Sequence, residues 1–218
     1  MLDVIRTLSL AMILTAFVAV ESRSLRRALA AYMAQALLMV GVIAGFATIH
    51  PPLAIWALTA FATKFALISW VLWREIRRGG DEEVAPRVGP LVSAIVISVL
   101  AVACYRFVHV NVAVLAPTPM AEAEPFRTNV AVALTLLAIG VYAIVTRRDA
   151  LKVVLGVCLM ENGAHLSLVS LATTMRETVL IGIVTDVVVA VVLLLYLIRA
   201  IAERLGTRDS SQLALLKG

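Results

Sequence analysis

Charged residues are scarce in this chain of 218 residues. Only 15% of the sequence is Asp, Glu, Lys or Arg, whereas a soluble globular chain has about 25%. Hydrophobic residues make up 62%, and they gather in runs of about 17–25 residues, the length that spans a bilayer. A soluble globular fold is therefore excluded, and the sequence predicts an all-α, polytopic membrane protein.

Cysteine and histidine are also rare, with two and three residues, and the motifs that they build are absent from the sequence. The two cysteines, Cys104 and Cys158, fall inside apolar runs and have no metal-ligand or disulfide spacing, so we interpret them as small core residues. No phosphate-binding loop, zinc spacing or iron–sulfur motif is present. A haem within the membrane would need histidine ligands on facing helices. Because His50 and His109 fall at the ends of apolar runs, the sequence disfavours haem. The sequence thus predicts no catalytic residue, metal ligand or bound cofactor in this chain.

The apolar runs predict about seven transmembrane helices. The boundaries follow from charged clusters and from His50-Pro51-Pro52, since proline cannot continue the helical hydrogen-bond ladder. Trp70 and Trp73, near one helix end, suit the membrane interface. The expected helices cover residues 4–20, 28–48, 53–73, 88–104 or a little beyond, 129–146, 151–172 and 179–198.

The basic residues predict the orientation. The sequence pI near 9.7 could suggest nucleic-acid binding, but the Lys and Arg residues sit in short loops between apolar runs. Fourteen of the 19 fall after the first, third and fifth helices or in the tail, and three fall on the opposite side. By the positive-inside rule, the N-terminus lies outside and the C-terminus in the cytoplasm.

This helix pattern suggests four regions. A three-helix unit covers residues 1–78, and residues 79–127 hold a charged loop, one helix and an outer loop. A second three-helix unit covers residues 128–203, and residues 204–218 form a cytoplasmic tail.

One ionisable pair stands out in the middle of the sixth run. Glu161 and His165 are four residues apart, so they share a helix face. Glu161 lies about 15 Å from the start of that run at about 1.5 Å per residue, near the centre of a hydrocarbon core about 30 Å thick. A charged group at that depth costs roughly 2.5–3.5 kcal/mol on insertion scales and indicates a functional site.

Two further ionisable groups fall within apolar runs, Lys64 in the third and Asp186 in the seventh. Lys64 can pair with an acid across a helix interface or with one on a neighbouring subunit. A proton relay through Glu161, Asp186, Lys64 and His165 explains these groups, because buried lysine and carboxyl groups can exchange protons. The alternative is a static buried ion pair that fixes helix register.

Residues 159–166, Leu-Met-Glu-Asn-Gly-Ala-His-Leu, followed by Ile-Gly-Ile-Val-Thr-Asp at 181–186, resemble hydrogenase-4 component E. This family comprises membrane subunits of group 4 nickel–iron hydrogenases, including formate hydrogenlyase-type complexes. Ala-Phe-Ala-Thr-Lys at 60–64 and Leu-Lys-Gly at 216–218 also resemble the family, so the similarity covers nearly the whole chain.

The last three helices resemble a wider group, which includes the K or 4L subunit of respiratory complex I and the C subunit of multi-subunit cation/proton antiporters. The complex I subunit has two mid-membrane glutamates on its second and third helices. By this resemblance Glu161 matches the first glutamate, and Asp186, one methylene shorter, takes the place of the second.

The resemblance implies a non-catalytic membrane subunit of a hydrogenase-type oxidoreductase complex in the bacterial inner membrane. Antiporter-like membrane subunits and soluble hydrogenase subunits are the implied partners, and nickel–iron and iron–sulfur centres are expected in those partners. Proton translocation would be coupled to hydrogen or formate metabolism. Two alternatives stay open at this point: a subunit of a cation/proton antiporter, and a purely structural scaffold of the membrane arm.

Overall fold

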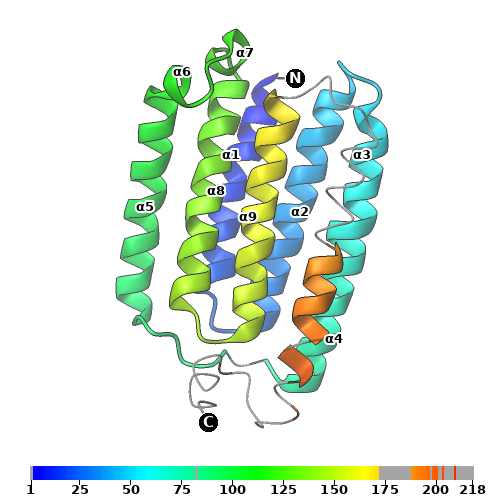
Figure 1. Cartoon of the computed structure of the whole chain (residues 1–218), viewed down its shortest axis with the longest axis vertical. Coiled ribbons are helices and arrows are strands. Elements are labelled where there is room, and N and C mark those ends of the chain that lie inside the picture. Colours follow the sequence, from blue (N-terminus) through cyan, green and yellow to red (C-terminus); the bar gives the residue numbers. More distant parts are fainter. Residues whose placement is uncertain are drawn as a thin grey trace.

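Long helices standing side by side make up the fold of the computed structural model (Figure 1). The structure describes residues 2–81, 83–171, 188–196 and 198–200, together with Glu203 and Asp209. Within these residues the chain is almost entirely helical and contains no strand longer than an isolated bridge. The prediction of an all-α, polytopic membrane protein is confirmed.

Six helices are long and apolar enough to cross a membrane, counting only the described part of the chain. The third span is continuous but is divided by a π-helical stretch, and two short helices lie between α5 and α8. The long elements are α1 (Leu2–Glu21), α2 (Leu25–Ala47), α3 (Leu53–Ala60), η1 (Phe61–Ile68), α4 (Ser69–Gly79), α5 (Pro90–Val110), α8 (Phe126–Thr146) and α9 (Ala150–Leu171); the short ones are α6 (Val112–Leu115) and α7 (Pro119–Glu122).

The helix boundaries differ from the predicted ones mainly in the third and fourth spans. The third helix was expected to end at Trp73, but it continues to Gly79, because the charged residues after Trp73 are compatible with a helix and extend it beyond the apolar run. Gly80 then ends it with φ of 91°, a conformation that suits glycine. The fourth helix starts at Pro90 and reaches Val110. The seventh expected helix, 179–198, is described only from residue 188 onward.

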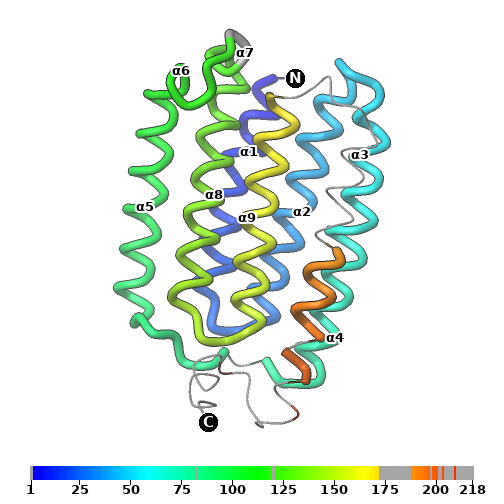
Figure 2. Tube along the Cα trace, viewed as in Figure 1, coloured from blue at the N-terminus to red at the C-terminus, as the bar shows by residue number. Residues whose placement is uncertain are grey.

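Helices α8 and α9 form the most tightly packed pair, a hairpin that can be followed in Figure 2. A Cβ atom on Gly163 would lie 2.6 Å from the backbone oxygen of Ala133, and one on Gly140 would lie 2.7 Å from that of Gly156. Small residues at these crossings let the two backbones approach closely, as in many membrane helix pairs. The α8–α9 contact therefore fixes how α9 is rotated about its axis.

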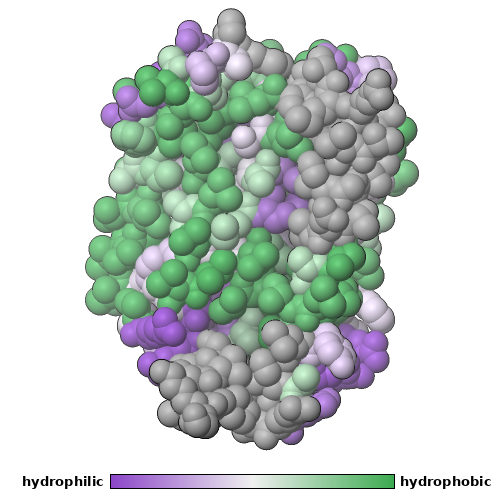
Figure 3. All heavy atoms as spheres, in the orientation of Figure 1, coloured by the Kyte–Doolittle hydropathy of each residue, from purple (hydrophilic) through white to green (hydrophobic). Residues whose placement is uncertain are grey.

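The remaining helices surround this pair. Helix α1 packs on α2 and α8, α5 packs on α8 and α1, and α3 to α4 pack on α2. Helix α5 lies at one edge of the bundle and α3–α4 at the other (Figure 1). Figure 3 shows a broad hydrophobic band across the visible face, interrupted by a hydrophilic patch near its middle, with further hydrophilic residues toward both ends. Such a band is the pattern expected of a surface that meets lipid.

The aromatic residues near the end of the third span lie at the surface of the bundle. Trp70 and Trp73 are exposed, and Arg74 and Arg77 stack over their rings at 5.7 and 4.6 Å. Such aromatic–cation pairs are typical of the headgroup region of a bilayer.

Candidate functional site

A buried ionisable site lies at the centre of α9. Glu161 is the twelfth of the 22 residues of this helix, close to its midpoint. His165, one turn further on, places Nδ1 3.1 Å from Glu161 Oε1, so the two side chains share a face as the spacing predicts. Gly163 lies against α8 instead, which turns Glu161 and His165 away from α8.

Lys64 reaches this site from the third span. Its Nζ lies 2.7 Å from Glu161 Oε1 and 2.9 Å from Asn162 Oδ1, and it donates a hydrogen bond to the asparagine oxygen. Lys64 and His165 are each 1% exposed, Glu161 is 8% exposed and Asn162 is fully buried. Of the two pairings that the sequence allows for Lys64, the structure shows the one within this chain, across the interface between η1 and α9.

The backbone around Lys64 is unusual, since residues Phe61–Ile68 form a π-helix. Stretches of π-helix are rare and occur frequently at functional sites. The backbone oxygen of Lys64 accepts hydrogen bonds from Tyr32 Oη at 3.4 Å and from Ser69 Oγ at 3.3 Å. Side chains from two elements thus hold the backbone at the residue whose ammonium group enters the site.

The other neighbours of the site are aromatic and apolar. The Trp56 ring lies edge-on to the His165 imidazole, with ring centroids 5.6 Å apart. Tyr32 and Cys158 belong to the apolar cluster that packs α2, α4 and α9 together. In this buried environment an ion pair experiences a lower effective dielectric constant than in water, and each charge depends on its partner.

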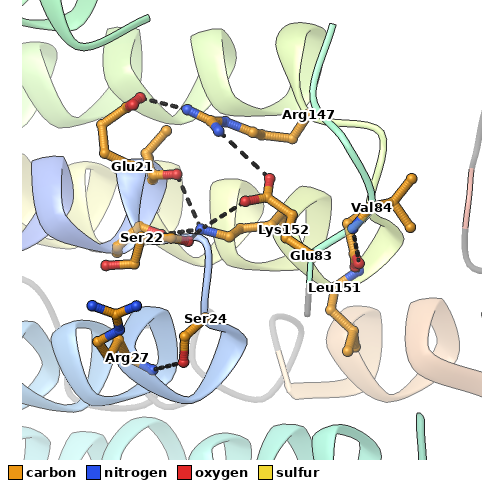
Figure 4. Close-up of polar contacts among 12 residues, drawn as sticks. Glu21, Ser22, Ser24, Arg27, Glu83, Val84, Arg147, Leu151 and Lys152 are labelled. Atoms are coloured by element: carbon orange, nitrogen blue, oxygen red, sulfur yellow. Dashed lines mark hydrogen bonds and ion pairs between the residues drawn. The ribbon is translucent and has the colours of Figure 1, made fainter. Parts of the chain in front are cut away.

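A second charged cluster lies at the end of the bundle where α1, α5, α8 and α9 meet the connection between α4 and α5. We call Glu21, Glu83, Arg147 and Lys152 the basic-end cluster (Figure 4). Arg147 pairs with Glu21 and lies 3.5 Å from Glu83, and Lys152 Nζ lies 3.8 Å from Glu83.

Lys152 also caps the end of α1. Its Nζ donates to the backbone oxygens of Ala19, Val20 and Ser22 at 2.8, 3.0 and 2.6 Å. The last carbonyl groups of a helix have no partner within the helix, so an ammonium group that donates to them is stabilising. Lys152 therefore joins the start of α9 to the end of α1.

The connection between α4 and α5 is anchored at two acidic residues. Asp81 accepts from the backbone N–H of Arg26 at 2.7 Å and from the Ser24 hydroxyl, and the Arg26 bond is the main reason that the pKa of Asp81 lies below its ordinary value. The Glu83 side chain is only 2% exposed, and burial raises its pKa because the contacts to Arg147 and Lys152 are too long to offset the lost hydration.

The four residues predicted for the relay are not all observed together. Lys64, Glu161 and His165 meet in one site. Asp186 lies outside the described residues, so its place relative to them stays a prediction. His109 lies near one end of α5, as its place at the end of an apolar run predicts, and it contacts Glu124 at 3.3 Å.

The sequence pattern does not predict the role of Asn162 or the basic-end cluster. The positive-inside rule treats Arg147 and Lys152 as loop cations, yet Arg147 is 3% and Lys152 1% exposed. Two features of the sequence could have indicated this cluster. Arg147 stands close to Asp149 beside one apolar run, and Glu21 stands at the end of another. Within the described part of the chain, no group of three or more His, Cys, Asp or Glu residues could hold a metal ion.

The geometry defines a class of protein: a polytopic helical membrane protein with a buried Lys–Glu–His site at the centre of one span. Residues 129–218 match the family of NADH-ubiquinone/plastoquinone oxidoreductase chain 4L. That region includes α8 from its fourth residue onward and the whole of α9, which carries Glu161.

The chain belongs to the hydrogenase-4 component E family. It is 31% identical to hydrogenase-4 component E of Escherichia coli K12, of Escherichia coli O157:H7 and of Shigella flexneri. Each alignment covers 99% of this chain and 98% of the relative. No solved structure matches the chain with significant similarity.

Proposed function

We propose that this chain is a non-catalytic membrane subunit of a hydrogenase-type oxidoreductase complex and that it moves protons through the site around Glu161. The observation that carries the proposal is the buried contact set of Lys64, Glu161 and His165 at mid-span. Buried ionisable groups are costly in a bilayer, and in membrane proteins they commonly form proton relays.

The proposed relay uses two proton carriers. In the starting state the Lys64 ammonium faces the Glu161 carboxylate. A proton that reaches His165 forms an imidazolium, which transfers its Nδ1 proton across 3.1 Å to Glu161 Oε1. Glu161 is then a neutral carboxylic acid and His165 is neutral again, so the positive charge has entered the site without a change in the charge of Lys64. Asp186 is the proposed next acceptor.

The relatives support the setting of this relay. They are named as components of hydrogenase-4, and the 4L family is named for an NADH-quinone oxidoreductase. We place the chain in the bacterial inner membrane beside antiporter-like membrane subunits, with its N-terminus outside and its C-terminus in the cytoplasm. The nickel–iron and iron–sulfur centres would then belong to soluble partner subunits, where redox chemistry takes place.

The membership of the complex is tested by purifying the tagged chain from its native membrane in mild detergent and identifying its partners by mass spectrometry. We expect a nickel–iron large subunit, an iron–sulfur small subunit and antiporter-like proteins. Recovery of antiporter subunits alone would refute the hydrogenase assignment and favour ion exchange.

The alternative of a purely structural scaffold predicts a different response to Glu161→Gln, which keeps the shape of the side chain and removes its titration. Under the relay, the variant complex assembles but loses coupled proton movement. Under the scaffold, the variant impairs assembly or changes nothing. Native gel electrophoresis reports assembly and proton translocation by the assembled complex reports coupling; measured together, and compared with a Ser98→Ala control on the exposed side of α5, they separate the two outcomes.

A further inference from the structure

The ammonium group of Lys64 has two acceptors of different chemistry. Glu161 Oε1, at 2.7 Å, belongs to a group whose charge changes when it binds a proton. Asn162 Oδ1, at 2.9 Å, belongs to an amide that stays neutral at every physiological pH. The hydrogen bond to Asn162 therefore does not depend on the protonation state of Glu161.

This second acceptor matters because a neutral carboxylic acid attracts an ammonium group weakly. If Glu161 were the only partner, each protonation would free Lys64 to move away, and the next deprotonation would leave a buried carboxylate without its counter-charge. Asn162 is fully buried, and its neighbour Gly163 is pressed against α8 with room for no side chain. The acceptor that holds Lys64 is therefore fixed to the most tightly packed helix pair.

The backbone end of Lys64 is held as well. Tyr32 of α2 and Ser69 of α4 both donate to the Lys64 carbonyl oxygen. With hydrogen bonds at its backbone and at its ammonium group, Lys64 is secured at both ends. This arrangement suits a residue that stays in place while the proton moves.

We propose that Asn162 is a positioning residue that keeps the Lys64 ammonium beside Glu161 after Glu161 has bound a proton, so that Lys64 is a fixed counter-charge and the mobile proton passes between Glu161 and His165. This inference rests on the proposed function and assigns a separate role within the same site. The titratable groups that face Glu161 among the described residues are Lys64 of η1, His165 and Cys158 of α9, and Tyr32 of α2.

The test is an infrared pH titration of the full-length chain in lipid nanodiscs. The carbonyl stretch of protonated Glu161 is assigned by its absence in Glu161→Gln. In Asn162→Leu, which removes the acceptor at similar volume, the ammonium group loses its second anchor. It is then free to leave Glu161 once Glu161 is protonated, and this freedom favours the protonated state. We expect the protonation midpoint of Glu161 to move to higher pH by about one unit or more, a tenfold change in proton affinity.

Three further variants make the result specific. Asn162→Gln keeps an amide oxygen and should restore a midpoint near that of the native chain. Asn162→Ala should shift the midpoint in the same direction as Asn162→Leu, which covers the case in which the leucine variant does not fold. In a Lys64→Met background, Asn162→Leu should produce no additional shift, because the effect of Asn162 passes through Lys64.

Several results would overturn the role of Asn162. A midpoint that moves to lower pH would mean that Asn162 merely competes with Glu161 for Lys64. An unchanged midpoint, or a shift that persists in Lys64→Met, would also refute it. The titration needs no turnover, so its failure is distinct from a failure of the proposed function, which normal proton translocation by Glu161→Gln would reveal.

Discussion

The buried pair of Lys64 and Glu161 predicts strong energetic coupling between these two residues. The side chains are 1% and 7% exposed and lie 2.7 Å apart, so removing either one leaves the other charged and buried without its partner. Breaking a buried ion pair in this way costs about 3–5 kcal/mol, much more than breaking a pair at the surface. We therefore expect Lys64→Met and Glu161→Gln each to lower the free energy of unfolding by about 3 kcal/mol or more.

The double variant should lose less than the sum of the two single variants. With both charges removed, no uncompensated charge remains, and a coupling energy of about 1–3 kcal/mol is expected for residues in direct contact.

The assay is reversible unfolding of the purified chain in mixed lipid–detergent micelles, with SDS as the denaturant. Arg26→Met is the matched control, because Arg26 is an exposed cation outside the site and its substitution should add to Glu161→Gln without coupling. Additive losses for Lys64→Met and Glu161→Gln, at every pH, would refute the conclusion that the two side chains form a charged buried pair.

Two other predictions concern packing and pH. Gly163→Ala should lower the free energy of unfolding by about 1–3 kcal/mol, because the added Cβ would lie 2.6 Å from the Ala133 backbone oxygen. Gly89→Ala, whose added Cβ would have nothing within 4 Å, should change this free energy little. Equal effects of the two variants in the same unfolding assay would contradict this packing. Burial raises the pKa of Glu83 above its ordinary value of 4.5, so its contribution to stability is complete below that value and is lost as pH rises through the folded-state pKa. The stability of the native chain relative to Glu83→Gln should thus fall between acidic and neutral pH in thermal unfolding, and a rise would show that the pairs with Arg147 and Lys152 dominate instead.

The sequence was sufficient to predict the helical fold and the central position of the site. Long apolar runs leave little choice of architecture, since a spanning chain must satisfy its backbone groups within helices. The four-residue spacing of Glu161 and His165 predicted their shared face, and the structure shows their side chains in contact. These features depend on local periodicity, which a sequence displays directly.

Features that depend on contacts between distant residues were not predictable in the same way. The sequence left open whether Lys64 pairs within the chain, because helix order does not specify which faces meet. The π-helix around Lys64 has no signal in its residue types. Arg147 and Lys152 read as loop cations, and only the folded arrangement shows that acidic residues from α1 and from the α4–α5 connection bury them.

The most direct test of the proton relay is the ratio of protons translocated to electrons transferred, measured in proteoliposomes that contain the purified complex. The complex is compared with its Glu161→Gln variant and with the Ser98→Ala control, at matched subunit composition. The relay predicts that Glu161→Gln lowers the ratio while electron transfer through the complex persists, and that Ser98→Ala leaves it unchanged. A native ratio in an assembled Glu161→Gln complex would contradict the relay and leave Lys64 and Glu161 as a structural pair.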